Sequence, residues 1–159
     1  MEVNTTRFGK LEYTEEEIVT LTSPLLGFQQ YRRFLLLPAG QDATLFWLQS
    51  VDAGELAFLL MDPRAVATDY QAPIAAGDLR DLGADSPGEV SVFTTVAVPG
   101  DGKVRTNLRA PLLYHPQRKL AKQVVLENTD YPIQYYIATA QSRKEAQDGA
   151  SHAYTDSQT

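Results

Sequence analysis

The sequence contains no cysteine among its 159 residues, which excludes disulfide bonds, thiolate zinc sites and cysteine nucleophiles. Tryptophan occurs only once and histidine only twice. The N-terminal segment carries no long apolar run behind a basic start, so we expect neither a signal peptide nor a membrane span. Because 159 residues are enough to bury a core, one domain is expected.

Positive charge is also scarce, since 14 basic residues face 20 acidic ones and the formal net charge is −6. An acidic surface repels nucleic acid phosphates and favours basic protein partners. Solubility alone is the alternative explanation of this charge.

The most apolar part of the sequence is residues 44–63. Two short apolar runs, 45–48 and 56–61, flank turn residues, a pattern typical of buried strands. We therefore predict a β-hairpin with its connection near Ala53 and Gly54. Trp47 is among the side chains expected to build the core.

Other short apolar or β-branched runs predict further strands, separated by glycine and proline turns. These runs are 6–13 (a strand pair reversing near Gly9 and Lys10), 18–21, 34–37, 89–99, 104–108, 112–114 and 123–127. One short helix is expected over residues 77–82, ended by Gly83. The fold class is therefore all-β: a single-domain antiparallel β-barrel-like fold or roll with one short helix.

The last segment, residues 139–159, has Tyr154 as its only large apolar side chain. Because this segment can bury little apolar surface, it cannot offset the conformational entropy lost on ordering. We therefore expect a polar, disordered C-terminal tail. The expected domain covers residues 1–138.

Catalytic motifs are sparse. His115 follows a predicted strand without other metal-ligating residues at a recognisable spacing, which indicates an ordinary strand-end imidazole. Two carboxylate pairs, Asp52 with Glu55 and Asp62 with Asp69, leave open a small β-barrel hydrolase. The competing interpretation is that these residues shape turns.

A second alternative is an oligonucleotide-binding barrel. Arg32 and Arg33 lie between Tyr31 and Phe34, an arrangement that suits base stacking beside phosphate contacts. Residues 118–122 carry further basic side chains. The overall acidity argues against this alternative.

Four blocks of the sequence occur together and in the same order as in a known family. They are TRFGKLEYTEEEIVTLTSPLLGF (6–28), FWLQSVDAGELAFLLMDP (46–63), TNLRAPLLYHP (106–116) and KQVVLENTDYPIQY (122–135). With these blocks the chain resembles the flagellar assembly factor FliW family. The resemblance implies a compact β-barrel-like fold and a cytoplasmic, non-enzymatic protein without cofactors. It also implies two partners that exclude one another: CsrA, an RNA-binding translational regulator, and flagellin.

Contact residues for such partners are predicted from polarity and position. The acidic candidates would dock basic side chains, and the apolar candidates would anchor the interface. The set comprises Phe46, Asp52, Glu55, Asp78, Leu79, Asp81, Asp85, Asn107 and Arg109. Arg109 is expected to pair with a carboxylate such as Asp62 or Asp130, with structural and recognition roles both left open. A monomer is expected, with no direct contact to nucleic acid or membrane.

Overall fold

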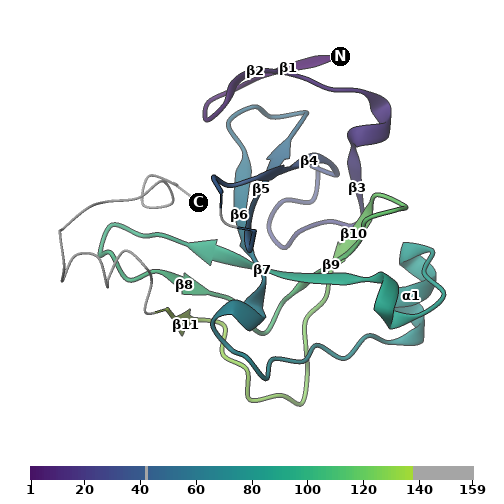
Figure 1. The fold of residues 1–159 in the computed structure, drawn as a ribbon, viewed down its shortest axis with the longest axis vertical. Helices are drawn as coiled ribbons and strands as arrows, with labels where there is room; N and C mark the ends of the chain where they lie inside the picture. Colours follow the sequence, from purple (N-terminus) through teal and green to yellow (C-terminus); the bar gives the residue numbers. More distant parts are fainter. Residues whose placement is uncertain (42, 138–159) are drawn as a thin grey trace.

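The computed structural model describes residues 1–41 and 43–137 (Figure 1). The predicted tail lies outside these residues, so its disorder and the domain boundary at residue 138 stay predictions. The strands are β1 (Glu2–Thr5), β2 (Gly9–Glu12), β3 (Val19–Ser23), β4 (Arg33–Pro38), β5 (Leu45–Ser50), β6 (Ala57–Met61), β7 (Ser91–Ala97), β8 (Arg105–Thr106), β9 (Leu112–His115), β10 (Leu120–Gln123) and β11 (Tyr135–Tyr136). The helices are α1 (Ala76–Leu82) and three 3-10 turns, η1 (Glu15–Glu17), η2 (Pro63–Ala65) and η3 (Pro87–Glu89).

The main sheet closes on itself. The strands of its closed part follow the order β7-β6-β5-β4-β3-β10-β9, and β9 pairs again with β7. Figure 1 shows β7 crossing the middle of the molecule, where it belongs to both ends of this order. Outside this closed part, β8 pairs with β7 and β11 pairs with β8. The predicted class, an all-β barrel with one short helix, is confirmed. One pairing departs from the antiparallel expectation, because β10 lies parallel to β3.

The barrel interior is apolar and takes side chains from every one of its strands. Phe34, Leu48 and Leu60 are at most 1% exposed, and Phe93 and Tyr114 belong to the same cluster. Successive residues of a strand point to opposite faces, so each strand also has an outward face. Because both faces of these strands are buried, their sequences are continuous apolar runs rather than alternating apolar and polar residues.

The predicted hairpin is confirmed as β5 and β6, with Leu45 opposite Met61 and Gln49 opposite Ala57. Trp47, Leu59 and Met61 point outward from the barrel and form a second buried cluster with Val96 and other side chains. Phe8 covers Trp47 in an edge-to-face contact with ring centroids 6.2 Å apart. The hairpin is therefore core on both faces.

The N-terminal hairpin of β1 and β2 forms a separate two-stranded sheet. Its reversal covers residues 6–8, so the prediction of a reversal near Gly9 and Lys10 was wrong by about three residues. The reason is local: the Thr5 hydroxyl accepts a hydrogen bond from the Phe8 N–H and donates one to the Gly9 carbonyl. This side chain closes the turn before Gly9.

The end of the predicted helix and the position of the strand predicted at 123–127 can both be compared with the structure. The helix is confirmed, with Gly83 ending it at φ +67° in the left-handed region. The strand predicted at 123–127 is instead β10 at Leu120–Gln123. Residues beyond it form hydrogen bonds outside the ladder, from Val124 N–H to the Pro111 carbonyl and from Leu126 N–H to the Arg109 carbonyl. The apolar run 124–126 therefore belongs to a loop that packs on the barrel.

Candidate functional site

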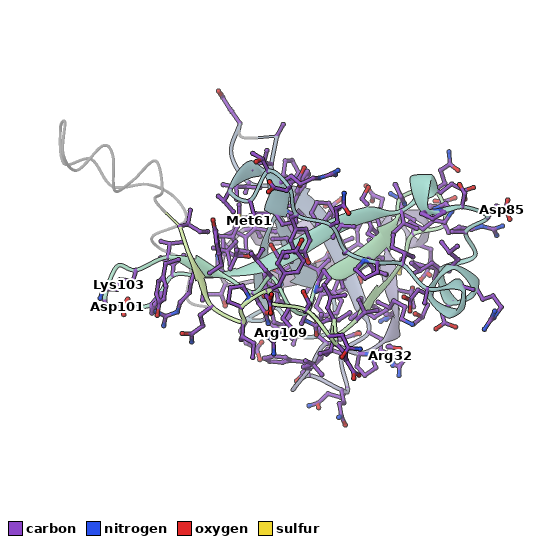
Figure 2. All side chains as sticks on the ribbon, turned by 90° about the horizontal axis from the view of Figure 1, so that it is seen from below. Arg32, Met61, Asp85, Asp101, Lys103 and Arg109 are labelled. Carbon is purple, nitrogen blue, oxygen red and sulfur yellow. The ribbon has the colours of Figure 1, made fainter. Side chains whose placement is uncertain are left out.

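The predicted contact residues lie in separate places rather than on one surface. Asp78, Leu79, Asp81 and Asp85 belong to α1 and the segment after it, whereas Asp52 and Glu55 belong to the β5–β6 turn. Figure 2 places Asp85 at one end of the molecule, Asp101 and Lys103 at the opposite end, and Arg109 between them. The predicted contact residues therefore do not form one continuous surface.

The carboxylates of α1 are held by a cation from the barrel. Lys122 on β10 places its Nζ 2.9 Å from Asp78 Oδ1 and 2.8 Å from Asp81 Oδ2. The hydrogen bond and charge of Lys122 lower the pKa of Asp81. Burial lowers the pKa of Lys122, but hydrogen bonds and charges from Asp81 and Asp78 outweigh burial and leave that pKa raised. Both carboxylates therefore fasten the helix to the barrel, and their charge is partly neutralised.

The other two candidates near α1 differ in exposure. Asp85 is exposed, and its backbone N–H donates to the Glu89 carboxylate at 3.2 Å. Leu79 is half-buried, while Leu82 is the fully buried side chain of the helix. Asp85 is thus available at the surface, and Leu79 only in part.

The turn between β5 and β6 presents Asp52 and Glu55, both exposed. Arg33 of β4 donates to both Asp52 oxygens, at 2.7 and 3.3 Å. The hydrogen bond and negative charge of Asp52 raise the pKa of Arg33, and Glu15 adds a smaller effect. Glu55 has no ion-pair partner among residues 1–41 and 43–137.

An acidic group that was not among the predicted contact residues lies near this turn. Glu12 and the three glutamates of η1 are exposed, and Glu15 contributes to the field at Arg33. Thr6 N–H donates to the Gly54 carbonyl, which joins the N-terminal hairpin to the turn. The run Glu15-Glu16-Glu17 was visible in the sequence as a concentration of negative charge. That it lies near Asp52 and Glu55 became apparent only from the fold. We call these side chains the acidic end: Glu12, Glu15, Glu16, Glu17, Asp52 and Glu55.

Asn107 and Arg109 act locally. The Asn107 Oδ1 accepts hydrogen bonds from the N–H groups of Arg109 and Ala110, at 3.0 and 3.2 Å. The Arg109 guanidinium donates to the carbonyls of Tyr131 and Thr129, at 2.9 and 3.4 Å. The predicted carboxylate partner for Arg109 was therefore wrong: the guanidinium holds the 129–131 loop through backbone oxygens.

Phe46 is half-buried and lies against the barrel interior. Its ring contacts that of Phe93 in an edge-to-face arrangement with centroids 5.2 Å apart. This packing accounts for the side chain without any partner.

Residues considered for catalysis are engaged in structural contacts. Asp62 accepts from the Arg64 N–H and lies 3.6 Å from its guanidinium. His115 is buried, with Nε2 3.2 Å from Glu89 Oε1 and Nδ1 accepting weakly from the Arg118 N–H. Within the described parts of the chain, no three His, Asp or Glu side chains gather in a way that could hold a metal ion.

The fold also separates the basic and aromatic side chains of residues 31–34 that were considered for nucleic acid binding. Phe34 is fully buried in the barrel and Arg33 is paired with Asp52. The stacking surface predicted around residues 31–34 is therefore not formed. Among the helices that the structure describes, none has the length and apolar character needed to cross a membrane.

Comparison with known proteins agrees with the fold. A family model described as FliW protein matches residues 2–137. The flagellar assembly factor FliW of Magnetococcus marinus is 38% identical over 131 residues, which cover 80% of each chain. That of Syntrophotalea carbinolica is 38% identical over 130 residues, covering 82% of this chain and 93% of the relative.

A solved structure supports the same assignment. The crystal structure of the flagellar assembly factor FliW superposes with a TM-score of 0.78 at 26% identity, covering 86% of this chain and 96% of the other. The match spans the barrel rather than one motif. The chain belongs to the FliW family of flagellar assembly factors.

Proposed function

We propose that this chain is a cytoplasmic, non-enzymatic binding protein that sequesters the translational regulator CsrA and also binds flagellin. The observation that carries the proposal is membership of the FliW family over nearly the whole described chain. By binding CsrA, the chain would relieve repression of flagellin mRNA.

The charge distribution supports a basic partner. The chain has a net charge of −6, and the acidic end comprises six exposed carboxylates, of which Asp52 pairs with Arg33 and Glu15 raises the pKa of Arg33. An RNA-binding regulator presents basic side chains to phosphates, so its surface complements this one. Electrostatic complementarity raises the association rate and selects the partner.

Mutually exclusive binding would make the chain a switch without any catalysis. If flagellin and CsrA cannot occupy it together, each lowers the apparent affinity of the other by mass action. Free flagellin would then release CsrA and stop further flagellin synthesis. Export of flagellin would reverse the effect.

Isothermal titration calorimetry with the full chain tests this proposal. CsrA and flagellin are each titrated into the protein at micromolar concentration, and CsrA is then titrated into the preformed flagellin complex. We expect binding in both single titrations and a strongly reduced apparent affinity in the third. Binding of neither partner would refute the proposal; an unchanged third titration would refute exclusivity alone.

A further inference from the structure

A groove lies between the segment before α1 and the loop after β10. Its volume is about 390 Å³. Apolar side chains form most of the lining, including Ile74, Val125 and Leu126. Two carboxylates, Asp78 and Glu127, belong to the lining as well.

One wall of the groove is an extended segment with an outward edge. Val124 and Leu126 direct their N–H groups to the Pro111 and Arg109 carbonyls, at 3.0 and 2.7 Å. In an extended chain successive N–H groups point in opposite directions, so the Val125 N–H points away from residues 109–111. It donates no hydrogen bond to any part of the chain that the structure describes. The Val125 side chain is 51% exposed.

The charge at this groove has one sign. Glu127 is exposed and has no ion-pair partner among the described residues. Lys122 of β10 neutralises part of the Asp78 charge from the barrel side. Within residues 1–41 and 43–137, no cationic side chain lines the groove.

A second apolar groove provides the contrast. It has a volume of about 380 Å³ and includes the exposed Leu26 and Ile133. Its charged member is Arg105, and side-chain amides rather than carboxylates accompany it in the described part of the lining. Arg105 is paired with Asp101 at 3.6 Å. The second groove therefore offers a basic partner no free carboxylate in the described lining, and the first groove, with Glu127, is the better match although both are apolar.

We propose that the groove at residues 73–78 and 124–127 binds an extended basic segment of a protein partner. The segment adds as a strand along residues 124–126, where the Val125 N–H and carbonyl pair with its backbone. An apolar side chain of the segment enters the groove against Ile74 and Val125, and a flanking Lys or Arg side chain meets Glu127, which is unpaired within the described residues. This assignment rests on the proposed function, because it makes the groove the contact site for the basic partner CsrA.

Matched substitutions at the two grooves test the assignment. Val125→Arg/Glu127→Lys places cations where the segment must dock. Ile133→Arg/Asp69→Lys is the control: it makes the same charge changes at exposed side chains outside this groove and outside the acidic end, with Ile133 at 59% exposure. CsrA is titrated into each full-length variant by calorimetry after circular dichroism has confirmed folding. We expect the first variant to bind at least about tenfold more weakly, and the control to stay within about threefold of the wild type.

Each other result contradicts the proposal in a recognisable way. If the wild type binds CsrA and the groove variant binds equally well, the groove assignment is wrong and the proposed function stands. If only the control variant loses affinity, the second groove is the contact site and the groove assignment is wrong. If the wild type does not bind CsrA, the CsrA part of the proposed function fails and the groove assignment falls with it. Should the double variant not fold, Glu127→Lys alone replaces it, since this side chain is exposed.

Discussion

At the scale of single residues, polar side chains in this protein mainly hold loops to the barrel. Arg109 bonds two carbonyls of the 129–131 loop, and Asn107 bonds two N–H groups within its own turn. Tyr70 donates its hydroxyl to the Leu108 carbonyl at 2.7 Å, and burial raises the pKa of this phenol. A buried backbone carbonyl without a donor is costly, so these side chains stabilise loops that have no ladder of their own.

Replacing Arg109 by Ala should destabilise the protein by about 1–3 kcal/mol, because two loop carbonyls lose a charged donor. The free energy of unfolding is measured in urea. Arg109→Lys should recover only part of the loss, since an ammonium cannot reproduce the guanidinium geometry. Full recovery by lysine would show that charge, not geometry, matters here.

Trp47→Ala should cost about 3–5 kcal/mol, because it empties a buried site beneath Phe8 and Arg7. Circular dichroism during urea unfolding is the suitable measurement, since the protein's only tryptophan is removed. Tyr136→Ala, at a side chain that is 55% exposed, is the control and should change stability by less than about 0.5 kcal/mol. Unchanged stability with lost partner binding would instead make Trp47 an interface residue.

At the scale of elements, the N-terminal hairpin and α1 are attached to the barrel in different ways. The hairpin packs apolar side chains against Leu35 and Val51, and Phe8 covers Trp47. The hairpin meets the β5–β6 turn at Gly54, where an added Cβ would fall directly on the Asn4 carbonyl oxygen. The helix is attached through Lys122 and through the buried Leu82. Gly54 is therefore a point of close backbone approach for the hairpin, and Lys122 is the charged attachment of the helix.

Gly54→Ala should lower the melting temperature clearly, because the new methyl group displaces β1 from the turn. Gly77→Ala is a matched control inside α1, where the nearest atom to an added Cβ is the flexible Arg80 side-chain nitrogen at 3.5 Å. Alanine favours a helix over glycine by about 0.5–1 kcal/mol, so this control should stabilise slightly. Equal melting temperatures for the two variants would contradict the contact at Gly54.

The attachment of α1 should depend on pH. The pKa of Asp81 is lowered in the folded chain, so its contribution to stability is present above the ordinary aspartate pKa near 4 and is lost as the pH falls through the lower folded value. The pKa of Lys122 is raised, so its contribution is present below the ordinary value of 10.5 and is lost as the pH rises through the folded value.

Lys122→Met should therefore lower the melting temperature at neutral pH, and the difference from the wild type should shrink at both extremes. Thermal unfolding between about pH 3 and pH 11 provides the measurement. A difference that stays constant over this range would show that lost packing of the lysine stem, rather than the ion pairs, is responsible.

At the scale of the whole molecule, the barrel brings distant segments together and sorts the charge. The β3–β10 pairing joins residues about one hundred positions apart, including Leu120 opposite Thr20. The acidic end combines β2, η1 and the β5–β6 turn, while the two apolar grooves carry opposite charge. A partner can therefore distinguish the two grooves by the sign of their charge as well as by their shape.

The affinity for a basic partner should fall as salt is raised from about 50 to 500 mM, because screening shortens the reach of exposed charges. Stopped-flow association measurements should show the loss mainly in the association rate. An association rate that does not respond to salt would mean that the acidic surface does not steer the partner.

The sequence by itself determined the elements whose signals are local. Short apolar runs between turn residues identified the β5–β6 hairpin, and Gly83 marked the end of α1, because period and turn chemistry act over a few positions. The four sequence blocks that resemble the FliW family could be identified for the same reason, since each is a continuous stretch of residues. Contacts between segments far apart in the sequence were decided only by the tertiary structure. These are the parallel β3–β10 pair, the hydrogen bonds from Arg109 to loop carbonyls, and the ion pairs of Lys122 with Asp78 and Asp81. Polarity shows that a side chain needs a partner, but which group reaches it is settled only when the barrel closes.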